Sequence, residues 1–277
     1  MADPGPLGGR TVIVTRARAQ AGELTEALQR LGAAVLEAPV IELADPPDWA
    51  PCDAAVAALA TYDWIAFTSA NTVDRFLARA ARVGRDVAAA LAAVRVGQAS
   101  GPRAAAIGAA TARRLAARGI FVALTADSAR AEGLFAALDR VGAAAPGRRV
   151  LVPRALEARE TLPESLRAAG ATVDVVPVYR VVAAPFDAAP VAAALRAGHV
   201  DVITFLSGSA TRAFVDALRQ PDGSAPSLAA VRAVAIGPVT AAVLRELGFS
   251  RVYEATGTDV AAVAAAVVTV CEEESPS

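Results

Sequence analysis

The 277-residue sequence contains no lysine, one histidine and two cysteines, and only 5% of its residues are aromatic. Without lysine no Schiff base can form, which excludes the chemistry of pyridoxal phosphate. His199 alone cannot supply a catalytic triad or a multi-histidine metal site, so no bound metal is expected. Cys52 and Cys271 are far apart and differ in context, which argues against a disulfide framework and for a reducing compartment.

Charge is balanced, with 27 arginines against 28 acidic residues and a net charge of −1. The absence of a basic excess argues against a nucleic-acid partner. Arginine is the only strong side-chain cation, and its forked guanidinium suits carboxylates. The opening MADPGPLGGR has no secretory signal pattern, and the apolar stretch Val260–Val270 is too short to span a bilayer. A soluble, cytoplasmic protein without membrane attachment is expected.

The sequence also repeats itself. GRTVIVTRARAQ begins at Gly9 and GRRVLVPRALEA begins at Gly147, an offset of 138 (147 minus 9). YDWIAFTSANTV from Tyr62 resembles VDVITFLSGSAT from Val200 at the same offset, and AAAIGAATA resembles AVAIGPVTA further on. Each copy reads as strand–turn–helix units whose strands lack alternation, which indicates parallel sheets buried on both faces. An α/β protein of two lobes is predicted, with tandem and crossed-over arrangements both open.

Small hydroxyl residues follow four of the predicted strands, at the carboxyl ends where open parallel sheets bind ligands. The four turns are Thr68–Asn71, Gly108–Thr111, Ser207–Ala210 and Gly237–Thr240. Each hydroxyl has a plain alternative role as a helix cap. Four such turns in matching positions favour an anion-binding cleft, in which helix N-termini bind carboxylates.

Arg16 and Arg154 end equivalent strands of the repeat. Each could fork onto a ligand carboxylate or pair with a nearby acidic side chain. Tyr179 lies on an extended segment. It is either a partly buried strand tyrosine with one hydrogen bond or a phenol that donates a proton to a departing group. No glycine-rich phosphate loop follows a strand in either half, so no nucleotide cofactor is expected.

Read in order, these motifs resemble those of uroporphyrinogen-III synthases. The matching segments are VTR, GAAVLEAP, WIAFTSANTV, AIGAATA, VYR, FLSGS and AIGPVTA, and the resemblance runs from roughly Arg10 to Ala266. It implies two flavodoxin-like parallel-sheet lobes joined by a two-stranded antiparallel linker, made from Ala38–Pro46 and Val176–Pro185. One lobe would combine residues 1–38 with 182–277, and the other would hold residues 39–181.

The resemblance further implies a lyase that works without a cofactor. Hydroxymethylbilane would lose its hydroxyl as water and close with its terminal (D) ring inverted. The bilane cyclises unaided to the wrong isomer, so the enzyme would mainly orient it. The resemblance assigns Tyr179 to departure of the hydroxyl. It assigns substrate binding to Ser69, Thr111, Ser207, Arg232 and Thr240, to which the strand-end arginines Arg16 and Arg154 are added as candidates.

Two other readings of the sequence stay open. The first is a non-catalytic two-lobed sensor that binds an anionic ligand, and the second is a cofactor-dependent flavodoxin-like enzyme. The absence of an export signal argues against the sensor, and the absence of a phosphate loop argues against the second enzyme. A monomer is expected, because nothing in the sequence suggests an obligate apolar interface.

Overall fold

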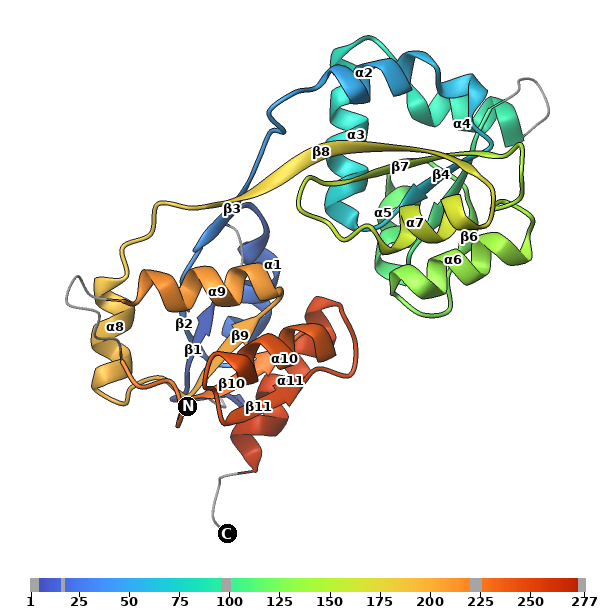
Figure 1. Cartoon of the computed structure of the whole chain (residues 1–277). Helices are drawn as coiled ribbons and strands as arrows, with labels where there is room; N and C mark the ends of the chain where they lie inside the picture. Colours follow the sequence, from blue (N-terminus) through green and yellow to red (C-terminus); the bar gives the residue numbers. More distant parts are fainter. Residues whose placement is uncertain (1–4, 16–17, 96–100, 220–225, 274–277) are drawn as a thin grey trace. The chain divides into compact units, whose positions relative to one another are not determined.

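A computed structural model describes residues 5–15, 18–95, 101–219 and 226–273. The chain forms two compact units (Figure 1), which are called unit 1 (Met1–Leu43 with Val182–Ser277) and unit 2 (Ala44–Val181). Unit 1 is discontinuous, because the chain leaves it after Leu43 and returns at Val182. No helix in the described ranges is both long and apolar enough to cross a membrane.

Unit 1 contains a parallel sheet with helices on both faces. Its elements are β1 (Thr11–Val14), α1 (Arg18–Arg30), β2 (Ala34–Glu37), α8 (Ala189–Arg196), β9 (Val202–Phe205), α9 (Gly208–Ala217), β10 (Arg232–Ala235), α10 (Pro238–Glu246), β11 (Arg251–Glu254) and α11 (Val260–Glu272). In the described part of this unit the strands pair in the order β11-β10-β9-β1-β2. Every pair in that order is parallel.

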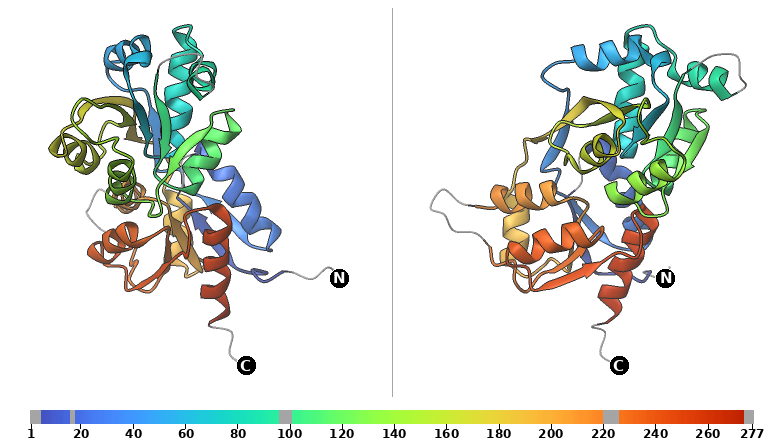
Figure 2. Two further views of the ribbon diagram at one scale, coloured as in Figure 1. Left: turned by 90° about the vertical axis from the view of Figure 1, so that its right-hand side faces the viewer. Right: turned by 45° about the vertical axis from the view of Figure 1, so that its right-hand side comes forward.

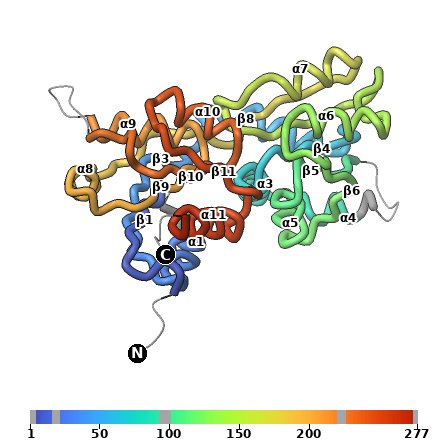
Figure 3. Tube along the Cα trace, turned by 90° about the horizontal axis from the view of Figure 1, so that it is seen from below, coloured from blue at the N-terminus to red at the C-terminus, as the bar shows by residue number. Residues whose placement is uncertain are grey.

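Alternate side chains of each strand enter different cores, which explains why these strands are apolar throughout. In β1, Val12 and Val14 pack with α1 and α11, whereas Ile13 packs with α8, α9 and α10. Figure 3 shows α1 beside α11 and, separately, α9 beside α10. The predicted α/β class with parallel sheets is therefore confirmed for this unit.

Unit 2 is built in the same way. Its elements are α2 (Ala50–Ala57), the 3-10 helix η1 (Leu59–Thr61), β4 (Trp64–Phe67), α3 (Ala70–Arg82), α4 (Val87–Arg95), β5 (Arg103–Ala106), α5 (Ala109–Ala117), β6 (Val122–Thr125), α6 (Ala131–Arg140), β7 (Arg149–Ala155), α7 (Thr161–Ala168) and β8 (Thr172–Ala183). The strand order is β3-β8-β7-β4-β5-β6, where β3 is Ile41–Ala44. Helices α6 and α7 lie together and share a core with one face of this sheet (Figure 2).

The sequence repeat reappears as a repeat of strand pairing. Apart from β3, the two orders coincide when β1, β2, β9, β10 and β11 are matched with β7, β8, β4, β5 and β6. The registers coincide as well, since Val12 faces Val202 in unit 1 and Val150 faces Trp64 in unit 2. Strand β1 pairs with β9, from the other end of the chain, and β7 pairs with the earlier β4. The first strands of each repeat thus complete a sheet with the later strands of the other.

An aspartate braces the amino end of each sheet at equivalent positions of the repeat. In unit 1, Asp201 accepts hydrogen bonds from the Arg10 guanidinium at 2.9 Å and the Thr11 N–H at 2.8 Å. In unit 2, Asp63 accepts from the Arg148 guanidinium at 2.8 Å and the Arg149 N–H at 2.9 Å. The brace ties together the two strands that come from different parts of the chain, and it lies at the end of the sheet opposite the predicted site.

Candidate functional site

The four predicted turns all follow strands at the carboxyl ends of the two sheets. In unit 2, β4 leads into α3 and β5 leads into α5, and in unit 1, β9 leads into α9 and β10 leads into α10. Each of these helices therefore presents its N-terminus, with its free N–H groups and partial positive charge, at the edge where doubly wound sheets bind ligands.

Two of the four turns are closed by their own serine. Ser69 accepts a hydrogen bond from the Thr72 N–H at 3.1 Å and caps α3. Ser207 does the same for α9, accepting from the Ala210 N–H at 3.1 Å. Both serines are half-buried in extended backbone. These contacts are those of helix caps, the plain alternative that the sequence left open for them.

The other two turns have glycine at the cap position. Helices α5 and α10 begin after Gly108 and Gly237, and neither has a side-chain cap. Thr111 and Thr240 occupy the third helical position of the two helices, and each is only 4% exposed. Within the described ranges, no hydrogen-bond partner of either hydroxyl is found, and no buried side-chain oxygen lacks a partner. Both hydroxyl oxygens must therefore reach the surface beside N–H groups that no side chain caps.

Strand register places Tyr179 at the carboxyl edge of unit 2. The pairing of β4 with β7, continued in step, puts Phe67 level with Pro153, and Pro153 faces Val176 in β8. Tyr179 lies three residues beyond Val176, while Ser69 lies two residues beyond Phe67. Because adjacent strands are about 4.8 Å apart, β8 and β4, with β7 between them, are separated by about 10 Å. Tyr179 therefore shares an edge with the turns that precede α3 and α5.

The phenol of Tyr179 is largely buried yet free of internal hydrogen bonds. The residue is 8% exposed, and its backbone carbonyl accepts from the Leu156 N–H at 2.9 Å. In the part of the chain that the structure describes, its hydroxyl has no partner, and no buried side-chain polar atom is left unsatisfied. The oxygen must therefore be exposed, so it is available to an external acceptor.

The predicted arginines have different surroundings. Arg16 lies outside the described residues. Arg154, at the carboxyl end of β7, binds the carbonyls of Ala158 and Arg159 at 2.6 and 3.1 Å, and it forms an ion pair with Glu160. These are the contacts of the acidic-pairing alternative that the sequence left open.

Arg232 is the first residue of β10 and therefore lies at the amino end of the sheet in unit 1. Its Nε donates to the Asp201 carbonyl at 2.9 Å and its Nη1 donates to the Val270 carbonyl at 3.3 Å. Strands rise about 3.3 Å per residue, which separates Arg232 from the far end of its own strand by about 10 Å. The structure thus does not bring Arg232 to the turns of α9 and α10.

The groups with strongly raised pKa values lie elsewhere. Burial, with help from Asp53, raises the pKa of the Cys52 thiol to about 12. Burial and the hydrogen bond to Asp174 raise the pKa of Tyr62, which precedes β4 at the amino end of the sheet. Both groups are protonated at neutral pH, so neither supplies a thiolate or phenolate nucleophile.

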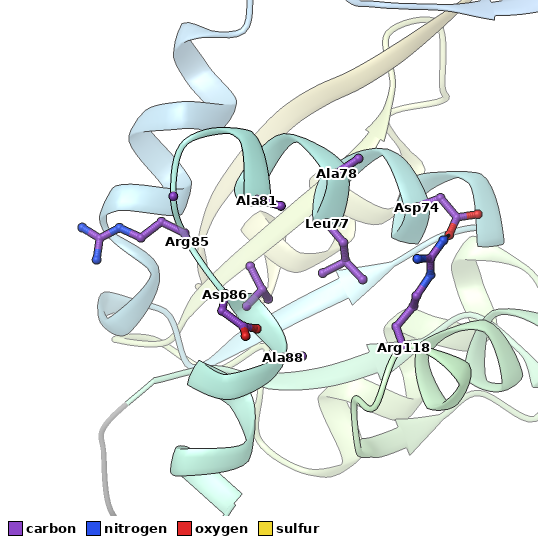
Figure 4. Close-up of a pocket in the computed structure, with 10 residues that line it drawn as sticks. Asp74, Leu77, Ala78, Ala81, Arg85, Asp86, Ala88 and Arg118 are labelled. Atoms are coloured by element: carbon purple, nitrogen blue, oxygen red, sulfur yellow. Dashed lines mark hydrogen bonds and ion pairs between the residues drawn. The ribbon is translucent and has the colours of Figure 1, made fainter.

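A pocket of about 560 Å³ on unit 2 is separate from the predicted site (Figure 4). It is lined by one side of α3, the turn after it, the start of α4 and the residue that follows α5, including Leu77, Ala81, Val87 and Arg118. The Arg118 guanidinium already donates to Asp74 at 2.7 Å. None of the predicted site residues lines this pocket.

Sequence reasoning did not predict that only two of the four turns have a side-chain cap. The sequence pattern gives all four the same role, but serine at the cap position can accept hydrogen bonds from the free N–H groups and glycine cannot. The glycines of the two AIG motifs, at Gly108 and Gly237, carried that signal. Of the four turns, it marks those that precede α5 and α10 as the two that no side chain caps.

Parallel sheets, flanking helices and two matching helix N-termini without side-chain caps, one in each unit, define a doubly wound α/β protein suited to an anionic ligand. The comparisons with known proteins are specific. A family model described as uroporphyrinogen-III synthase HemD matches residues 22–265. A uroporphyrinogen-III synthase of Synechococcus elongatus is 32% identical over 248 residues, which cover 87% of this chain and 88% of that protein. The chain belongs to the uroporphyrinogen-III synthase family, whose members are cyclising lyases of haem biosynthesis that act on a small tetrapyrrole.

Two solved structures show the same fold. A mutant uroporphyrinogen III synthase from Thermus thermophilus aligns with a TM-score of 0.62 at 20% identity, covering 96% of this chain and 100% of that one. A uroporphyrinogen-III synthetase from Helicobacter pylori aligns with a TM-score of 0.57 at 18% identity, covering 94% and 99%. At these identities the likeness concerns the fold alone, and it confirms the predicted α/β class with parallel sheets.

Proposed function

We propose that the chain converts hydroxymethylbilane to uroporphyrinogen III with inversion of the D ring, chiefly by holding the substrate in a folded conformation. The observation that carries the proposal is the pair of uncapped N-termini at α5 and α10, each with a surface-reaching threonine hydroxyl. The substrate carboxylates bind there, where main-chain N–H groups, the helix dipole and the hydroxyl of Thr111 or Thr240 combine. Such a site needs no lysine.

The two units are proposed to be flavodoxin-like lobes joined by a two-stranded antiparallel linker, with residues 1–38 and 182–277 in one lobe and residues 39–181 in the other. The strand order β2-β1-β9-β10-β11 and its counterpart in unit 2 follow the flavodoxin pattern 2-1-3-4-5. The Ala184 N–H donates to the Val40 carbonyl at 3.0 Å, and the Arg180 Nε donates to the Asp45 carbonyl at 3.2 Å. The partners run in opposite directions, which supports an antiparallel linker.

Tyr179 is proposed as the group that assists departure of the substrate hydroxyl. Its phenol donates a hydrogen bond or a proton to the leaving oxygen, which departs as water when the C–O bond breaks. The electron pair needed for ring closure comes from the substituted carbon of the terminal pyrrole. Cyclisation followed by rearrangement through a spiro intermediate then places that ring in the inverted orientation.

The larger part of the catalysis is proposed to be orientation. Holding two reacting groups of one molecule in attack geometry can be worth about 7–11 kcal/mol. A wrong isomer forms when the bilane closes unaided, so the bound conformation decides which carbon attacks. Ser69 and Ser207 stay predicted substrate contacts, and a monomer acting in the cytoplasm likewise stays a prediction.

Thr240→Val is expected to raise KM, with kcat/KM falling by about 10- to 100-fold, because a hydrogen bond to a charged carboxylate is worth about 1.5–3 kcal/mol. Valine keeps the branched shape, and the lost hydroxyl has no partner in the described part of the chain. The free energy of unfolding should therefore stay within about 0.5 kcal/mol of the parent value. Thr111→Val should behave in the same way. Steady-state kinetics and urea unfolding measure both quantities.

Thr211→Val is the matched control. Thr211 is fully buried in unit 1, and its hydroxyl donates to the Ser207 carbonyl at 3.0 Å. This substitution should leave KM unchanged and lower the free energy of unfolding by about 1 kcal/mol. A normal KM in both Thr240→Val and Thr111→Val would remove these helix N-termini from the substrate site.

A further inference from the structure

Arg154 and Arg232 are the two charged residues of the described ranges that are buried, each 6% exposed. Burying a guanidinium is costly unless its donors are satisfied. Arg154 meets this requirement within one short turn. Its Nη2 donates to the Ala158 carbonyl at 2.6 Å, its Nη1 donates to the Arg159 carbonyl at 3.1 Å, and Glu160 supplies a carboxylate. Three consecutive residues are therefore gathered around one side chain.

The near side of the same turn is bonded to β8 at Tyr179 and at Val181, two residues further along the strand. The Leu156 N–H donates to the carbonyl of Tyr179 itself at 2.9 Å. The carboxylate of Glu157 accepts from the N–H of Val181 at 3.2 Å. Residues 155–160, called the β7 turn, thus bridge the buried guanidinium and the backbone that carries the proposed catalytic phenol.

The pairing of β7 with β8 changes register at this point. Arg154 faces Pro177, but the next residue, Ala155, faces Tyr179, so Val178 is passed over. A shift of this kind bends the strand locally and re-aims the side chains that follow it. On the other edge of β8, the Arg180 Nε donates to the Asp45 carbonyl at 3.2 Å. The segment around Tyr179 is therefore bonded on both edges of β8, through its backbone to the β7 turn and through the Arg180 side chain to Asp45.

We infer that Arg154 is a positioning residue: its buried guanidinium holds the β7 turn in the shape that fixes the β8 backbone, and hence the phenol, at Tyr179. The inference rests on the catalytic role proposed for Tyr179. It gives the strand-end arginine of the second repeat a role different from carboxylate binding, because its donors point into its own turn. Without the hydrogen bonds of Arg154 the β7 turn would shift, and the phenol of Tyr179 would be displaced from the position that the reaction needs.

A double-mutant cycle tests this role. Arg154→Met keeps the aliphatic stem and removes the fork, and it should lower kcat by about 10- to 100-fold, since a 1 Å misplacement can cost about 100-fold. KM should change by less than about twofold, because no substrate contact is lost. In the Tyr179→Phe background, Arg154→Met should lower kcat by less than about twofold further, since two residues that act through one phenol are not additive.

Arg167→Met is the matched control. The Arg167 guanidinium also approaches Glu160, at 3.8 Å, but its other bond is to the Val173 carbonyl at 3.3 Å and not to the β7 turn. It should leave kcat within about twofold of the parent value. Glu157→Ala removes the hydrogen bond between the β7 turn and the Val181 N–H by changing an exposed side chain. It should lower kcat, and its effect should likewise not add to that of Tyr179→Phe.

A raised KM in Arg154→Met, with its effect undiminished in the Tyr179→Phe background, would show direct substrate binding and overturn the inference. If Arg154→Met does not fold, Glu157→Ala decides, and an unchanged kcat in that variant overturns the inference as well. An unchanged kcat in Tyr179→Phe alone would instead overturn the catalytic role of Tyr179, so the two failures are distinguishable.

Discussion

Tyr179→Phe should lower kcat by about tenfold or more, at the low end of general-acid effects, while leaving the free energy of unfolding nearly unchanged. The substitution removes one oxygen that has no hydrogen-bond partner among the described residues, and it keeps the buried ring in β8. Any loss of activity would therefore report the missing donor and not a damaged fold. Steady-state turnover of hydroxymethylbilane and urea unfolding measure the two quantities side by side.

Tyr62→Phe is the matched control within the same unit. The Tyr62 hydroxyl donates to Asp174 at 2.8 Å, and the residue precedes β4 at the amino end of the sheet. This variant should lose about 1.5–3 kcal/mol of stability, the value of a hydrogen bond to a charged group, and keep its kcat. Equal kcat values for Tyr179→Phe and the parent enzyme would contradict the proposed role of Tyr179.

Phe205→Ala should lower the free energy of unfolding by about 3–5 kcal/mol, as expected for a large buried aromatic residue. Phe205 is fully buried in β9, where its ring meets Phe214 and Phe249 edge-on, each at a centroid distance of 5.5 Å. Each aromatic pair adds about 0.5–1.5 kcal/mol beyond the area that is buried. Chemical denaturation followed by circular dichroism measures the loss.

Phe67 is the counterpart of Phe205 in unit 2, and its ring meets Phe76 edge-on at 5.9 Å. Phe67→Ala removes one aromatic pair where Phe205→Ala removes two, so it should cost about 0.5–1.5 kcal/mol less. A loss below about 1 kcal/mol in Phe205→Ala would contradict the packing described for unit 1.

Much of the fold could be predicted because the repeat carries three-dimensional information. An offset of 138 residues relates the pairs Val12–Val202 and Val150–Trp64, so matching letters correspond to matching registers. Strands that are buried on both faces can also be recognised in the sequence as apolar runs without alternation. The pairing of β1 with β9 had no such signal. Strand β4 is the counterpart of β9 in the repeat and is equally apolar, so the sequence does not tell which of the two pairs with β1.

The candidate site was only partly predictable. Serine and threonine at the four strand ends were found from the repeat, but hydroxyls that cap a helix and hydroxyls that remain open look alike as residue types. The difference depends on whether glycine or serine precedes the helix, as at Gly237 and Ser207. Cap chemistry could have supplied it from the sequence.

The contacts of the buried arginines are harder to predict from the sequence. The acceptors of Arg154 include two backbone carbonyls, which every residue possesses and no letter of the sequence specifies. Its contacts therefore could not be read from residue types. The position of Arg232 could have been predicted from the sequence, because a residue at the start of a parallel strand lies at the edge opposite the turns that follow the strands.

The central claim, that this chain folds hydroxymethylbilane so that its D ring closes inverted, is tested most directly by product analysis. Freshly made hydroxymethylbilane is incubated with the purified chain and no added cofactor, and the uroporphyrinogen isomers are resolved, with heat-denatured chain as the control. The type III isomer should predominate with the native chain, and only type I should form in the control. Type I alone in both samples would contradict the account.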